Sequence, residues 1–100
     1  LEGAPQLLQR LVIRYRLRPL ARDEVREYVE WRFRRAGLEG DPPIDAAAVD
    51  VVAKHSGGFP RVINGLCDFA LFAAMRLEKR VVDGDLMAQL CREFEEVTEV

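Results

Sequence analysis

The segment Ser56-Gly57-Gly58-Phe59-Pro60-Arg61 places a sharp reversal between two helices. Consecutive glycines permit the left-handed backbone that ends a helix, and proline suits the first turn of the next one. Arg61 is therefore expected in the first turn of a helix. Because a helix N-terminus presents free N–H groups and the positive end of its dipole, a guanidinium there favours a phosphate or carboxylate ligand. The same pattern also fits two helices joined by a tight turn with no ligand.

Four amphipathic segments predict an all-α bundle. We expect helices at about 22–36, from an N-cap at Asp45 to about 55, at about 60–78, and after an N-cap at Asp83. The third segment is apolar around most of its circumference, so it is expected to be the central helix. Gly65 interrupts it at a cost of about 1 kcal/mol relative to alanine, on a face with Arg61, Asn64 and Asp68. We expect a neighbouring backbone or a ligand to approach closely there.

The apolar stripes of these segments give the expected core. Neither cysteine lies in CxxC spacing or near the histidine, so both are expected to be buried free thiols. His55 ends an apolar stripe, which favours a C-cap role over catalysis. The expected buried residues are Val25, Tyr28, Val29, Phe33 and Ala36; Ile44, Ala48, Val51 and Val52; Ile63, Leu66, Cys67, Ala70, Ala73, Ala74 and Leu77; and Leu86, Met87, Leu90, Cys91 and Phe94.

A single β-strand is predicted before the helices. Ile13, Tyr15 and Leu17 alternate with arginines, which is the period-2 pattern of a half-buried strand, and Pro19 ends it. One strand cannot satisfy its backbone groups alone, so we expect it to join the sheet of a larger protein.

The run Ser-Gly-Gly-Phe-Pro-Arg-Val-Ile-Asn-Gly-Leu-Cys-Asp at 56–68 resembles the sensor-2 motif of AAA+ ATPases, in the form found in the general secretion pathway protein A (ExeA-like) family. Residues 10–20 are similar to the strand and Leu-x-Pro-Leu turn that lead into that family's helical lid. Residues 22–37 are similar to its first lid helix, although Ala21 replaces the usual serine and weakens the N-cap. The resemblance implies a C-terminal remnant of the α/β ATPase core at 1–20 and a helical lid at 21–100.

Specific roles follow from this resemblance. Arg61 is the candidate sensor-2 residue, reaching the β- and γ-phosphates of ATP bound in its own core. Arg10 resembles the arginine finger that acts on a neighbouring subunit, with Arg14 as a weaker substitute. The hinge before the lid is where adenine commonly packs in this superfamily. The implied nucleotide-binding residues are Leu17, Pro19, Leu20, Pro60 and Arg61.

The chain lacks the motifs that hydrolysis itself requires. There is no G-x-x-x-x-G-K-[ST] loop and no apolar run ending in paired acids that would hold Mg²⁺. We therefore expect a C-terminal part of a longer ATPase, inactive alone, whose parent binds ATP or ADP with Mg²⁺. Tight nucleotide binding by this chain and a metal site of its own are not expected. The implied partners are its own ATPase core, neighbouring subunits of a homo-oligomer, and secretion or cell-envelope proteins.

Charge and composition narrow the alternatives. The net charge of −2 argues against general affinity for nucleic acid. The charge is uneven, however, because the sequence through Gly37 contains nine arginines and five acidic residues. No run approaches the roughly 20 apolar residues that span a bilayer. Two unpaired cysteines fit a reducing cytoplasm, where the parent of such a lid can also be attached to the inner membrane.

Two other classes of function stay open. The chain could be a helical protein-interaction or DNA-binding module in which Arg14, Arg16 and Arg18 contact phosphates, but the acidic charge and the absence of a recognition helix count against this. It could also be the lid of a replication initiator or clamp loader, because a lid fold does not specify the work of the motor. The Cys67-Asp68 ending of the motif favours the secretion-type group.

Overall fold

The computed structural model describes residues 19–98, which form four helices and no strand. The helices are α2 (Arg22–Arg35), α3 (Ala46–Ser56), α4 (Pro60–Arg76) and α5 (Gly84–Thr98). The all-α expectation is confirmed for this part of the chain. The predicted strand, with Arg10, Arg14 and Leu17, lies outside the described residues.

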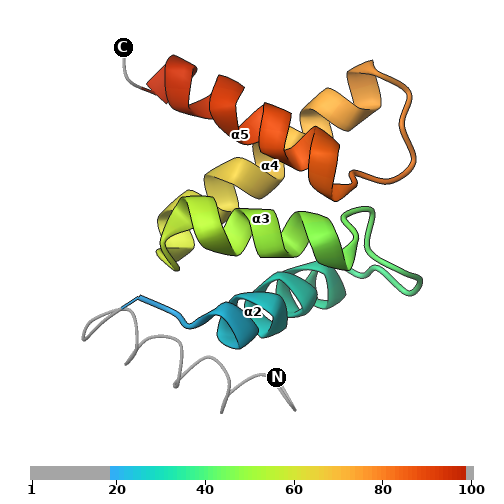
Figure 1. Ribbon diagram of the computed structural model, residues 1–100. Helices are drawn as coiled ribbons and strands as arrows, with labels where there is room; N and C mark the ends of the chain where they lie inside the picture. Colours follow the sequence, from blue (N-terminus) through green and yellow to red (C-terminus); the bar gives the residue numbers. More distant parts are fainter. Residues whose placement is uncertain (1–18, 99–100) are drawn as a thin grey trace.

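The central helix is α3, not α4 as the sequence indicated. α3 packs against each of the other three helices and lies between α2 and α5 (Figure 1). Its buried positions carry small side chains, Ala48, Val49 and Val52, which let neighbouring helices come close on more than one side. α4 instead leaves Phe72 and Met75 on the surface, 58% and 76% exposed. An apolar circumference in the sequence therefore did not correspond to burial on all sides.

Local capping chemistry sets the helix starts. The Asp45 carboxylate accepts a hydrogen bond from the Ala48 N–H, and the Asp83 carboxylate accepts one from the Leu86 N–H, both at 2.8 Å. Both predicted N-caps are confirmed. Ala21 has no capping side chain, but its N–H donates to Glu24 Oε1 at 2.8 Å, which retains the glutamate half of a capping box.

Short backbone hydrogen bonds tie the starts of α3 and α5 together. The Asp45 N–H donates to the Val82 carbonyl at 3.1 Å, and the Val82 N–H donates to the Pro43 carbonyl at 2.8 Å. The isolated parallel bridge between Ile44 and Val82 buries both side chains, which are 3% and 0% exposed. The two loops therefore add to the core as well as connecting helices.

Most of the expected core is buried. Cys67 and Cys91 are buried free thiols, as predicted, and burial raises the pKa of each to about 11. Leu77 and Ala36 are exposed, contrary to expectation, because each follows the last residue of its helix. Five others of the expected residues are half-buried rather than buried and pack against the core: Phe33, Val51, Ala73, Leu86 and Phe94. None of the described helices is both long and apolar enough to cross a membrane.

Candidate functional site

The glycine-rich bend between α3 and α4 forms as the sequence predicts. Gly57 caps α3 with φ 64°, Gly58 continues the reversal with φ 85°, and Pro60 opens α4. The buried Ser56 hydroxyl accepts a hydrogen bond from the Gly58 N–H at 3.1 Å and fixes the turn from inside. No side chain caps the start of α4, because Phe59 holds the N-cap position.

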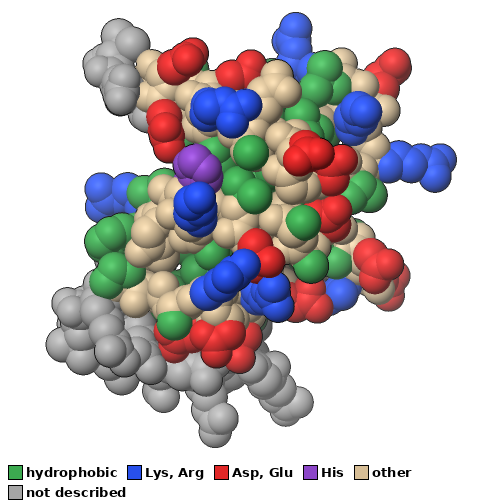
Figure 2. All heavy atoms as spheres, viewed as in Figure 1, with side chains coloured by type: hydrophobic (Ala, Val, Ile, Leu, Met, Phe, Trp, Pro, Cys, Tyr) green, Lys and Arg blue, Asp and Glu red, His purple; other side chains and the backbone are tan. Residues whose placement is uncertain are grey.

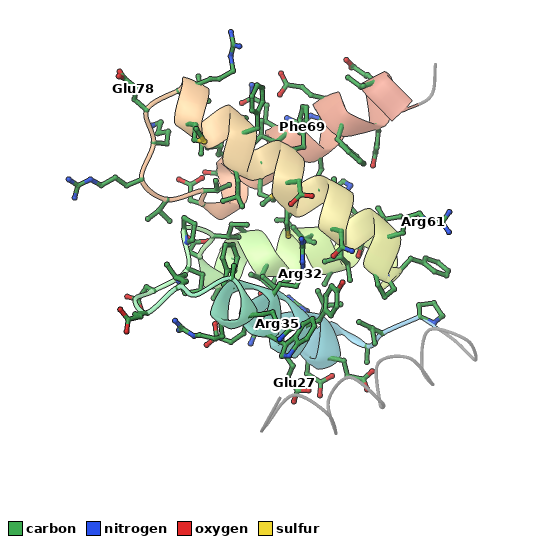
Figure 3. The ribbon with its side chains drawn as sticks, turned by 180° about the vertical axis from the view of Figure 1, so that it is seen from behind. Glu27, Arg32, Arg35, Arg61, Phe69 and Glu78 are labelled. Carbon is green, nitrogen blue, oxygen red and sulfur yellow. The ribbon has the colours of Figure 1, made fainter. Side chains whose placement is uncertain are left out.

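Arg61 lies in the first turn of α4 and is exposed. Its side chain forms no hydrogen bond or ion pair with any other residue in 19–98. Figure 3 shows it pointing away from the helices. A guanidinium without a partner among the described residues, beside helix N–H groups that no side chain caps, is suited to binding an anionic ligand.

Leu20, near the start of the described residues, contacts the same bend. It is only 5% exposed, and its N–H donates a hydrogen bond to the Gly58 carbonyl at 2.9 Å. Leu20 thus contacts the bend that leads into Pro60 and Arg61, and these are three of the five positions implied for nucleotide binding. Pro19 precedes Leu20 directly and is half-buried. The contact between Leu20 and Gly58 was not predicted from the sequence, where its only signal was the pair of adjacent glycines.

Two hollows flank this end of the bundle. One of about 540 Å³ is lined by Leu20, Arg22, Asp50, Val51, Ala53, Lys54 and Gly57. The other, of about 280 Å³, is lined by His55, Arg61, Val62, Leu66, Phe94 and Glu95. Within the described residues, no three His, Cys, Asp or Glu side chains gather as a metal site would require.

His55 does not cap α3. Gly57 takes that position, and His55 Nδ1 lies 3.1 Å from Glu95 Oε1 of α5. The predicted C-cap role is therefore wrong, because the ring turns toward a neighbouring helix rather than toward the last carbonyls of its own. The contact links α3 to α5 next to the Arg61 hollow.

Other polar residues of the 56–68 motif contact α2. Tyr28 Oη donates a hydrogen bond to Asn64 Oδ1 at 2.7 Å, and Arg32 forms an ion pair with Asp68 at 3.7 Å. Gly65 instead meets α5, where an added Cβ would lie 2.9 Å from the Phe94 ring. The expectation of a neighbouring backbone or a ligand at Gly65 is thus wrong, since an aromatic ring fills the space. Asn64 and Asp68 serve helix packing.

Acidic and basic side chains are interspersed on the face seen in Figure 2, so this face has no large patch of one charge sign. Part of this mixing comes from ion pairs across the α2–α3 surface. Asp50 pairs with Arg26 at 2.8 Å and with Arg22 at 3.1 Å. This cluster was not predicted from the sequence.

Comparison with known proteins gives one relevant relative. The chain is 42% identical over 82 residues to general secretion pathway protein A of Aeromonas hydrophila, a match that takes in 81% of this chain and 15% of that protein. The chain thus spans a small part of the relative's length. Neither a protein-family model nor a solved structure matches it. The identity supports a relationship with general secretion pathway protein A.

Proposed function

We propose that this chain is the lid domain of an AAA+ ATPase related to general secretion pathway protein A. In this proposal the lid couples ATP binding and hydrolysis to its own movement and to subunit assembly. The observation that carries it is Arg61, exposed and unpaired among the described residues at the uncapped start of α4, on the bend that also holds Leu20. The 42% identity to the secretion protein supports the same assignment.

Arg61 would act on the β- and γ-phosphates of ATP bound in the separate core. Phosphoryl transfer depends mainly on positioning and on neutralising charge that is spread over the phosphate oxygens. The planar guanidinium can donate two parallel hydrogen bonds to those oxygens. The contact would form only when the lid closes, so the nucleotide state would set the lid angle. Leu20 and Pro60 would lie beside the nucleotide, with Leu17 and Pro19 leading to it.

Assembly and location follow from the same proposal. Arg10 would serve a neighbouring subunit's nucleotide in a homo-oligomer, and the core would supply the Mg²⁺ site. The relationship to general secretion pathway protein A favours a role in secretion, with secretion or cell-envelope proteins as partners. We place the lid in the cytoplasm, in a parent that can be attached to the inner membrane.

Replacing Arg61 in the full-length protein tests the proposal. Arg61→Ala should reduce ATP turnover or affinity by roughly 30- to 150-fold, because a charge-assisted phosphate contact contributes about 2–3 kcal/mol. The fold should be retained, since the exposed side chain packs on little. Arg61→Lys should restore activity only in part, because an ammonium lacks the planar fork. Steady-state hydrolysis and nucleotide titration give these values.

Arg80→Ala is the matched control, because Arg80 is also exposed but lies in the loop before α5. It should hydrolyse ATP at the parental rate. If Arg61→Ala behaves like this control, or if it unfolds the domain, Arg61 is a structural residue of the helix start and the proposed function is wrong.

A further inference from the structure

The contact between Leu20 and Gly58 joins the segment before α2 to the bend before α4. The Leu20 N–H donates to the Gly58 carbonyl at 2.9 Å, and the Leu20 side chain is part of the core at 5% exposure. α2 begins two residues later and is anchored by the Ala21 carbonyl, which accepts from the Val25 N–H at 2.9 Å. The segment before α2 and the start of α4 lie at the same end of the bundle (Figures 1 and 3).

Only glycine fits at position 58. Its φ of 85° disfavours any other residue, and its Cα faces the Leu20 backbone so closely that an added Cβ would collide with the Leu20 carbonyl oxygen. That Cβ would also lie 2.9 Å from the Leu20 backbone nitrogen, the atom that donates to Gly58. Backbone atoms cannot rotate away as the end of a flexible side chain can. The Leu20 backbone therefore occupies the space that a Cβ at position 58 would need.

Gly57 differs in this one respect. It also has positive φ, 64°, but an added Cβ would meet only the Phe59 ring, at 3.6 Å, which is ordinary van der Waals contact. The two glycines therefore share the conformational requirement, and only Gly58 has the contact with Leu20.

We propose that Gly58 is a positioning residue that fixes Leu20 to the start of α4, so that Leu20 and Arg61 move as one rigid unit. The pivot between ATPase core and lid then lies on the N-terminal side of Leu20, and Leu20 travels with the lid. The consequence for ATP rests on the proposed function. Leu20 and Arg61, held at a fixed spacing, would approach and leave the core together, so lid closure would bring Arg61 to the phosphates at a set distance from Leu20.

Amide hydrogen exchange of this chain tests the contact itself, without any nucleotide. In the wild type the Leu20 amide should be protected to within about tenfold of the Ile63 amide of α4, because both would open only with the bundle. In Gly58→Ala its protection relative to Ile63 should fall by at least about tenfold, while Gly57→Ala should leave that ratio unchanged. A wild-type Leu20 amide that exchanges as fast as an unprotected one would overturn the proposal, even if Gly58→Ala fails to fold. Equal ratios in the two variants would overturn it as well.

A double-mutant cycle in the full-length protein tests the positioning role. If Gly58 holds Arg61 in register with the hinge, then in a Gly58→Ala background the further change Arg61→Ala should reduce ATP turnover by less than about tenfold, against roughly 30- to 150-fold in the parent. A merely structural glycine would leave the Arg61 factor unchanged, and that result would contradict the positioning role. If Arg61→Ala has no effect even in the parent, the proposed function fails, while the exchange experiment still decides whether Leu20 is fixed.

Discussion

Asp50 joins α3 to α2 by accepting hydrogen bonds from two arginines. Arg22 and Arg26 both reach its carboxylate, with the shortest contact, 2.8 Å, from Arg26 Nη2 to Asp50 Oδ1. The hydrogen bond from Arg22, followed by that from Arg26, lowers the pKa of Asp50 below its ordinary value of 3.8. Both arginine side chains are more than half exposed, so water and salt weaken each pair.

The lowered pKa predicts how stability depends on pH. The folded state favours ionised Asp50, so this contribution is fully present above the unfolded pKa near 3.8 and is lost as the pH falls through the lower folded value. The free energy of unfolding should therefore fall more steeply with acid in the wild type than in Asp50→Asn. Urea denaturation at a series of pH values measures both slopes. Parallel slopes below the unfolded pKa would show that the two arginines do not act on Asp50 in solution.

α2 contacts α4 through polar groups of the 56–68 motif. The Tyr28 hydroxyl donates to Asn64 at 2.7 Å while the tyrosine ring, 9% exposed, stacks on Trp31 with ring centroids 6.2 Å apart. Arg32 adds a longer ion pair to Asp68 (Figure 3 labels Arg32 between the two helices). The motif thus combines the exposed Arg61 with residues that hold α2 to α4.

Tyr28→Phe isolates the hydrogen bond between these helices. Phenylalanine keeps the ring packing but leaves Asn64 Oδ1 without this donor, so the free energy of unfolding should fall by about 1 kcal/mol. Chemical denaturation gives the value, and Asn64→Ala with the double variant completes the cycle. The two single changes should be non-additive. Full additivity, or wild-type stability of Tyr28→Phe, would mean that the hydrogen bond contributes nothing in solution.

At the scale of elements, the sequence predicted what depends on local chemistry. Asp45 and Asp83 are N-caps and Gly57 is a C-cap, because each signal lies within a few residues of the helix end that it determines. The predictions of the central helix and of the neighbour of Gly65 were wrong, because both depend on which elements meet in space. The sequence of a helix that is apolar on all sides does not indicate which side remains exposed. In α4 the exposed side carries Phe72 and Met75.

Across the whole molecule, the candidate site lies at the end where the α3–α4 bend meets Leu20 (Figure 3). The position of Arg61 could be predicted, because a Gly-Gly-x-Pro-Arg run fixes the first helical turn. The contact between Leu20 and the bend before α4 could not be predicted, since Leu20 and Gly58 are distant in sequence and no local pattern links them. The roles of Arg10 and Leu17, and of Arg61 itself on phosphate, stay predictions.

The most direct test is the accessibility of the Arg61 guanidinium with and without nucleotide. In the full-length protein, modification by phenylglyoxal followed by mass spectrometry reports the rate at each arginine. A bound non-hydrolysable ATP analogue should slow modification of Arg61 several-fold, because its donors would be engaged by phosphate oxygens, and should leave exposed Arg80 unchanged. Equal Arg61 rates in the nucleotide-free and analogue-saturated protein would contradict the account, since the arginine would then not contact the nucleotide.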